Sequence, residues 1–261
     1  MTITTSDNGV VGIEPLNDGE RYLTAHIADL QRKSAACGVP SFSAFLTERE
    51  AALAECAVKG KPLFYGGYDG AARTVCGFFE GTYAQTLPKE ELFPVCAVTL
   101  SFREFDRLSH RDFLGAILVL GIKRELVGDI LVAQGYAVVF CLKSAQELVL
   151  RLDKVGRTGV SAEKGLTKPL PPIRTEKIET TVSSLRLDCI LSAAAGISRD
   201  KSALLIKSGR VNADFSPCLR ADAQIKENTV ISVRGVGRYR LSAVNGESRK
   251  GRLRIVIEKF V

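Results

Sequence analysis

The spacing of hydrophobic residues predicts two helices at the start of the chain. Leu23, Ile27 and Leu30 recur at helical intervals after Asn17, so they share one face of a helix. A second helix follows Thr47-Glu48-Arg49-Glu50, whose first and last residues form a capping box. We therefore expect the chain to fold first as a pair of helices.

Strand-like segments then alternate with further helices. One helix is predicted after the N-cap Ser109, and another over 148–155 after a capping box of Ser144 and Glu147. The segments typical of strands are 63–65, 73–79, 93–102, 129–132 and 136–142. Strands mixed with helices at this spacing indicate an α+β layer fold.

A proline-rich stretch divides the chain. Pro169, Pro171 and Pro172 interrupt any regular element there. The expected organisation is a flexible start over 1–16, an α+β domain over 17–166, a linker with an extended segment over 167–183, and a small domain over 184–261.

The small domain begins with two short helices. Apolar residues from Leu187 to Ala194 share one face, Gly196 ends the first helix, and Ser198 caps a second helix that stops at Gly209. Two helices joined by a tight turn predict a helix-turn-helix-like pair. The β-prone segments that follow are 211–212, 229–233, 239–244 and 253–257.

Charge distinguishes the two domains. Residues 184–261 hold 15 Lys and Arg against 7 Asp and Glu, a net charge of +8, whereas residues 1–183 hold 21 against 22. So concentrated a positive charge favours a polyanion as partner. The alternative is a basic face that serves only solubility.

The start of the second helix is a candidate phosphate site, because free N–H groups and the positive end of the helix dipole lie there. Arg199 and Lys201 in its first turn would oppose that dipole unless an anion neutralises them. Distributed cations of this kind suit RNA read by shape and backbone. The candidate RNA-binding residues are Arg186, Ser198, Arg199, Lys201, Lys207, Arg210, Arg234 and Arg238.

The segment RLDCILSAAAGISRDKSALLIKSGRVN, followed by ISVRG, resembles the RNA-binding domain named for small-subunit ribosomal protein four, the S-four domain. The order and spacing match over about 50 residues. Two turns depart from the family pattern, Ala213-Asp214 and Glu227-Asn228-Thr229. This resemblance implies a small α+β domain that presents a basic groove to structured RNA.

The rest of the chain resembles the bacterial YlmH-like family. The resemblance rests on LSHRDFLGAILVLGIKRELVGDILV, GYAVVFC and FYGGYDGAARTVCGFF, and it extends from about residue 20 to the end. It implies an N-terminal domain with an RNA-recognition-motif-like (ferredoxin-like) sheet. It also implies a non-catalytic protein on the large ribosomal subunit that binds rRNA and tRNA during quality control of stalled nascent chains.

Other functions receive less support. Seven cysteines without a C-x-x-C pair, and only two histidines, argue against a zinc site, and we expect neither metal nor cofactor. Arg151-Leu152-Asp153 is similar to the catalytic triplet of pseudouridine synthases, so an RNA-modifying enzyme is the alternative; we expect the triplet to lie within the helix after Ser144. A third possibility is a protein whose basic tail binds acidic lipid or protein.

We expect this chain to be a cytoplasmic protein, to be a monomer and to have no membrane partner. No run of apolar residues is long enough to predict a transmembrane helix, and the first twelve residues lack the features of a secretory signal.

Overall fold

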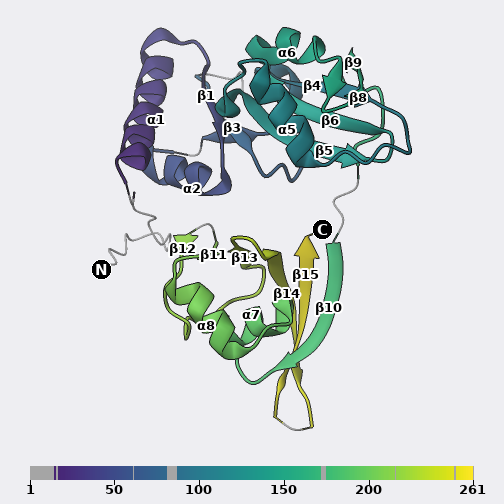
Figure 1. The fold of residues 1–261 in the computed structure, drawn as a ribbon. Coiled ribbons are helices and arrows are strands. Elements are labelled where there is room, and N and C mark those ends of the chain that lie inside the picture. Colours follow the sequence, from purple (N-terminus) through teal and green to yellow (C-terminus); the bar gives the residue numbers. More distant parts are fainter. Residues whose placement is uncertain are drawn as a thin grey trace. The chain divides into compact units, whose positions relative to one another are not determined.

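The computed structural model describes residues 15, 17–60, 62–80, 87–171, 175–214, 216–249 and 251–260. The chain divides into two compact units, residues 1–171 and 172–261 (Figure 1). The expected flexible start lies outside the described residues, apart from residue 15. Each unit has a hydrophobic core of its own.

The first unit opens with two helices packed against a small sheet. The elements are α1 (Asp18–Cys37), β1 (Ser41–Leu46), α2 (Glu48–Ala57), β2 (Leu63–Tyr65), β3 (Thr74–Phe78) and α4 (Lys89–Leu92). The strands form an antiparallel sheet in the order β1-β3-β2. Asn17 caps α1, and the predicted capping box of Thr47 and Glu50 begins α2.

A second sheet completes this unit. Its elements are β4 (Val95–Ser101), α5 (His110–Val119), η1 (Arg124–Leu126), β5 (Val127–Ala133), β6 (Tyr136–Leu142), α6 (Lys143–Leu150) and β9 (Ser161–Lys164), with a small hairpin of β7 (Lys154–Val155) and β8 (Thr158–Gly159) before β9. The strand order is β5-β6-β4-β9, with antiparallel neighbours. A β-α-β-β-α-β succession with this order is the ferredoxin-like arrangement, so the predicted fold class is confirmed.

Both faces of this second sheet are buried. Val98, Leu100 and Val139 face a core that they share with Phe113 of α5 and Val149 of α6. The neighbouring positions face the opposite way, because side chains alternate along a strand. On that face, side chains of β4 and β6 pack against residues of the three-stranded sheet; this second core contains Val95, Ala97, Val138 and Phe140 with Phe45, Tyr65, Val75 and Phe93.

A glycine allows the loop after β2 to approach the side chain of Phe140 in β6 closely. Gly67 has φ of 104°, and a Cβ there would lie 2.1 Å from Cδ1 of Phe140. Nearby, the carboxylate of Asp129 accepts hydrogen bonds from the Tyr68 hydroxyl at 2.8 Å and the Ala72 N–H at 2.7 Å. Burial and the neighbouring Asp129 raise the pKa of Tyr68, which keeps it a donor. The loop over 66–73 is therefore fixed to β5.

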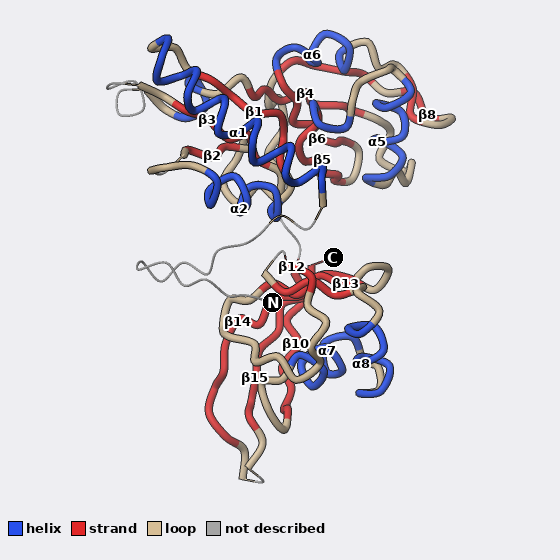
Figure 2. Tube along the Cα trace, turned by 90° about the vertical axis from the view of Figure 1, so that its left-hand side faces the viewer, coloured by secondary structure: helices blue, strands red, loops and turns tan. Residues whose placement is uncertain are grey.

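The second unit is a six-stranded antiparallel sheet with two helices. The elements are β10 (Thr175–Val182), α7 (Leu187–Ala195), α8 (Arg199–Lys207), β11 (Val211–Ala213), β12 (Ser216–Pro217), β13 (Val230–Val233), β14 (Gly237–Glu247) and β15 (Leu253–Phe260). The order is β10-β15-β14-β13-β11-β12. Both helices lie on one face of this sheet (Figure 2).

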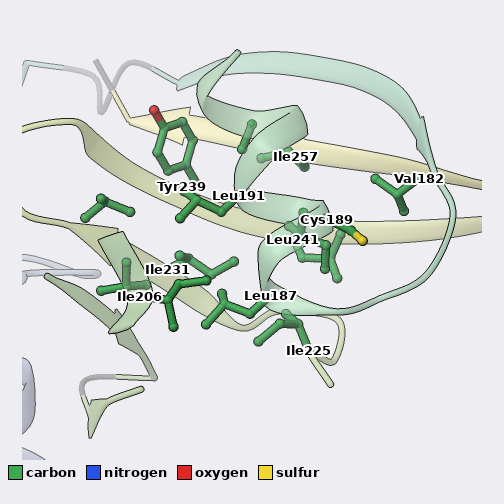
Figure 3. Close-up of a cluster of buried hydrophobic side chains, with 14 of the residues drawn as sticks. Val182, Leu187, Cys189, Leu191, Ile206, Ile225, Ile231, Tyr239, Leu241 and Ile257 are labelled. Atoms are coloured by element: carbon green, nitrogen blue, oxygen red, sulfur yellow. The ribbon is translucent and has the colours of Figure 1, made fainter. Parts of the chain in front are cut away.

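The core of the second unit joins the helices to that face. Leu187, Leu191 and Ile206 from the helices pack with Tyr239 and Leu241 of β14 (Figure 3). All five side chains are at most 2% exposed. Burial of about 1.5–3 kcal/mol per large apolar side chain makes this layer the main stabilising contact of the unit.

Several elements differ from the sequence-based expectation, among them the short α4, β7, β8, β9 and β12, which were not predicted. Residues 175–182, expected as an extended segment ahead of the compact domain, form β10 and pair with β15 along their whole length. The helix expected over 148–155 is α6, which begins at Lys143 with Leu142 at its N-cap, so the capping box of Ser144 and Glu147 was wrong. The strand β1 was not predicted.

Candidate RNA interface

The α7–α8 turn has the caps that the sequence predicted. Gly196 follows α7 with φ of 64°, and the Ser192 hydroxyl donates to the Ile197 carbonyl at 2.6 Å. The Ser198 hydroxyl accepts from the Lys201 N–H at 3.2 Å and so begins α8. The core below the helices and these caps fix the first turn of α8 as a rigid base for Arg199 and Lys201.

Arg186 and Arg199 converge on one carboxylate. Arg186 donates from Nε and Nη2 to Asp188 at 3.0 and 3.1 Å, and Arg199 donates from Nη2 at 3.0 Å. Asp188 is 5% exposed and also accepts from the Cys189 N–H at 2.9 Å. The three charged side chains therefore form a triad with a net charge of +1.

Electrostatics in the triad favour the charged forms. Burial raises the pKa of Asp188, but hydrogen bonds from Arg186 and Arg199 outweigh it and bring the pKa to about 2. The same hydrogen bonds raise the pKa of both arginines. Asp188 thus offsets part of the repulsion between Arg199 and the start of α8, while the side chains of Arg199 and Arg186 remain 55% and 39% exposed.

A stripe along α8 carries the two predicted lysines. Lys201 and Lys207 are exposed, and Leu204 between them is 68% exposed. Residues three apart on a helix are neighbours on its surface. The opposite side of α8, with Ser202, Leu205 and Ile206, faces the core.

Arg210 and Arg234 lie together beyond the end of α8. The Arg210 guanidinium donates to the Arg234 carbonyl at 3.0 Å, and the Arg234 N–H donates to the Arg210 carbonyl at 2.9 Å. Both residues are exposed. These hydrogen bonds hold the Arg210 guanidinium against the β13–β14 turn and fix the backbone of Arg234 beside it.

Arg238 is separated from these residues by the sheet. Tyr239 and Leu241 face the helices, so the alternation of β14 directs Arg238 to the other face. There its guanidinium carbon lies 5.0 Å from the centre of the Phe260 ring, a cation–π contact. The structure therefore pairs Arg186 with Arg199 and Arg210 with Arg234, aligns Lys201 and Lys207 along α8, and directs Arg238 to the other face of the sheet.

Arg252 is a further cationic residue near Arg199, because both line the same cavity. The sequence analysis did not name it as a candidate. It lies in the β14–β15 hairpin, and its Nη2 donates to the Thr181 carbonyl at 2.8 Å. The signal that could have revealed it is the basic run Ser248-Arg249-Lys250-Gly251-Arg252 between two predicted strands.

Among the described residues, the ferredoxin-like sheet of the first unit is covered on the face that RNA-recognition motifs leave open for base stacking. Phe140 is 1% exposed and Val138 is fully buried, both beneath the three-stranded sheet. Stacking of bases on β4 and β6 is therefore excluded in this packing. Two cations of the unit, Arg73 and Arg124, are half-buried and donate to the Val127 carbonyl, so they support the fold.

The triplet Arg151-Leu152-Asp153 does not lie inside a helix, and that prediction was wrong. Arg151 is the C-cap of α6, Leu152 is 5% exposed, and Asp153 is an exposed residue directly before β7. The triplet that is similar to that of pseudouridine synthases thus lies at the end of a helix, and its middle residue is buried in the core.

Within the described ranges, no group of three or more His, Cys, Asp or Glu side chains could hold a metal ion. In the same part of the chain, no helix is long and apolar enough to cross a membrane.

Comparisons with known proteins bear on both units. Residues 88–168 match the family model described as "Putative RNA-binding domain in YlmH". The chain is 30% identical over 200 residues to "Ribosome-associated protein quality control protein P2" of Bacillus subtilis (strain 168), covering 75% of this chain and 77% of that protein. The chain belongs to the YlmH-like family. The matched residues begin at α4 and contain the whole ferredoxin-like sheet of the first unit.

A solved structure that the comparison finds similar is described as "Cell division protein ylmH from Streptococcus pneumoniae". It is 20% identical, covers 60% of this chain and 95% of its own, and has a TM-score of 0.49. The YlmH family model and the Bacillus relative are named for RNA binding and quality control, not for a catalytic activity. The names of the family model and of the Bacillus relative support an RNA-binding role.

Proposed function

We propose that this chain is a non-catalytic RNA-binding protein of ribosome-associated quality control, which binds structured rRNA and tRNA on the large ribosomal subunit. The observation that carries the proposal is the position of the charge. The net excess of +8 belongs to residues 184–261, where α7 and α8 hold exposed cations in fixed positions. The Bacillus relative, by its name, supplies the ribosomal context.

The second unit is, in this proposal, an S-four-type domain. Its two capped helices, the Arg186–Asp188–Arg199 triad and the sheet behind them agree with the helical pair and small sheet that the resemblance implies. The contact surface is the α7–α8 side together with Arg210 and Arg234. These cations would meet phosphates, which position RNA without reading its sequence.

The first unit serves a different purpose in the same proposal. With both faces of its second sheet buried, it would contact RNA or protein through loops and helices. In the exposed first turn of α5, Arg111 would contact a phosphate, and His110, whose pKa is lowered by burial, would act as a neutral hydrogen-bonding group. The principal affinity for RNA nevertheless belongs to the second unit.

The direct test of RNA binding is the double variant Lys201→Ala with Lys207→Ala in the full chain. Neither lysine forms an ion pair among the described residues, so the fold should remain. Each lost phosphate contact should lower the slope of log affinity against log salt by about 0.7–0.9. Filter-binding titrations of a folded RNA at several salt concentrations measure this slope.

Lys33→Ala in α1 is the matched control, because it removes an exposed lysine of the first unit. Equal slopes for the double variant and this control would reject the α8 surface as the RNA contact. The ribosomal partner is tested by sedimentation of a lysate through a sucrose gradient. Migration with the large subunit and intact ribosomes is expected, and recovery only in the free fractions would reject that partner.

A further inference from the structure

A small cavity of about 250 Å³ opens in the second unit between the end of β10, α7, the start of α8 and the β14–β15 hairpin. Arg199 and Arg252 line it from different elements, and no Asp or Glu is among its lining residues. Asp188, which precedes the lining residue Cys189 in the sequence, already accepts hydrogen bonds from Arg186 and Arg199. The cavity therefore has a net positive lining.

Both arginines are held in place before any ligand arrives. Arg199 is fixed by Asp188, and Arg252 by the Thr181 carbonyl. The hairpin is itself held against β10, because Leu253 pairs with Val182. A guanidinium has five N–H donors, and the hydrogen bonds of the described residues engage only Nη2 in each arginine. The remaining donors are free to bind an anion with little further ordering.

The other polar lining is made of hydroxyl groups. Ser183 and Ser192 line the cavity with Thr181, and hydroxyls can donate to or accept from phosphate and sugar oxygens. The volume lies below the range of about 300–1,000 Å³ typical of whole small-molecule sites. Such a cavity suits one unit of a longer chain, with a phosphate between the guanidiniums and a sugar near the hydroxyls.

We propose that this cavity binds one phosphodiester of the RNA backbone, held jointly by Arg199 of α8 and Arg252 of the β14–β15 hairpin. The inference rests on the proposed RNA-binding function and extends it. Arg252 lies outside the segment that resembles the S-four domain, so the hairpin adds a second element to the RNA contact. Two forked cations converging on one phosphate give position as well as affinity.

Arg252→Ala in the full chain tests the assignment, with Arg249→Ala as the matched control. Arg249 is an exposed arginine of the same hairpin and does not line the cavity. We expect Arg252→Ala to lower affinity for folded RNA about tenfold, as for a charged hydrogen bond. The salt slope should fall by about 0.7–0.9. Arg252→Lys, which keeps the charge without the fork, should retain the slope and recover only part of the affinity.

The joint role is tested by combining Arg199→Ala with Arg252→Ala. If both hold one phosphate, the loss in the double variant is smaller than the product of the two single losses, because the contact is removed only once. Multiplicative losses, or equal effects of Arg252→Ala and Arg249→Ala, would overturn the joint site while leaving the RNA-binding function intact. A wild-type chain that ignores folded RNA would overturn both.

A second phosphate source is tested with phosphatidylglycerol vesicles. The proposal expects Arg252→Ala to affect RNA binding whether or not the vesicles bind. A loss confined to vesicle binding would assign the cavity to lipid and reject RNA. Thermal melts of each variant accompany the titrations, and a melt equal to that of Arg249→Ala shows that the fold is retained.

Discussion

Replacement of Asp188 by Asn should destabilise the second unit strongly. Asn has nearly the same shape and resembles the protonated, uncharged acid. The pKa of Asp188 is lowered from 3.8 to about 2 in the folded chain. At 1.36 kcal/mol per pKa unit, the charged form contributes about 2 kcal/mol to the free energy of unfolding near neutral pH. For a unit of this size, that corresponds to about 8–16 °C in Tm.

The pH dependence has a definite sign. The folded-state pKa of Asp188 lies below the unfolded-state value, so its contribution is complete above about pH 4 and is lost as pH falls towards 2. The wild-type second unit should lose this part of its stability in that range. Asp188→Asn should lack it at every pH, since Asn does not titrate.

The assay is urea unfolding of the full chain, followed by amide hydrogen exchange in peptides of residues 175–260, which separates the second unit from the first. Asp222→Asn is the control, because Asp222 pairs with Arg220 on the exposed surface and should contribute much less. The reasoning is refuted if Asp188→Asn and Asp222→Asn unfold at the same urea concentration. It is also refuted if Asp188→Asn retains the wild-type acid transition.

Two further predictions concern the first unit. Gly67→Ala should destabilise it by about 2–5 kcal/mol, because the new Cβ meets Phe140 and φ is positive; an unchanged urea midpoint would contradict this. Iodoacetamide at pH 8 should alkylate the exposed Cys37 and Cys56 first, whereas Cys76 is buried and its pKa is raised to about 12 by burial. Peptide mass spectrometry follows the labelling, and fast reaction of Cys76 in the folded chain would show that β3 is not packed as described.

The sequence predicted helix caps correctly where the capping hydrogen bonds join residues only a few positions apart. The caps at Thr47, Ser109 and Ser198 depend on side chains that bond to backbone or side-chain groups three residues away. The capping box at Ser144 failed for a tertiary reason. The chain enters α6 directly from β6, and the Lys143 N–H donates to the Pro94 carbonyl at 2.9 Å, so the helix starts without a side-chain cap.

Two strands were obscured by polar residues in unexpected places. In β1, Ser41 and Ser43 take buried positions, and the Cys76 N–H donates to the Ser43 hydroxyl at 2.9 Å. The hydrophobic alternation is therefore lost from the sequence. In β10, Ile178 and Val182 face the core, while Lys177 and Glu179 point to the opposite side of this edge strand. The sequence therefore resembles an extended polar segment.

The sequence predicted which residues belong to the candidate site better than it predicted how these residues contact one another. The Asp188–Arg199 contact joins residues eleven apart across the helix turn, and it follows only once α7 and α8 are packed. The alternation of side chains along a strand predicts the position of Arg238. Tyr239 and Leu241 face the core, so Arg238 points to the opposite face of the sheet. The basic run around Arg252 is visible in the sequence, but its contact with Thr181 depends on the long-range pairing of β10 with β15, which has no local signal.

The double burial of the ferredoxin-like sheet makes that sheet a poor fragment. Residues 88–168, the part recognised by sequence family, contain all its strands and both of its helices. Cut out alone, they would lose the partners of Val138 and Phe140 and expose an apolar face between β4 and β6. Such a surface favours self-association. The segment that the family model matches is thus smaller than the packed unit, because the three-stranded sheet covers the second face of the ferredoxin-like sheet.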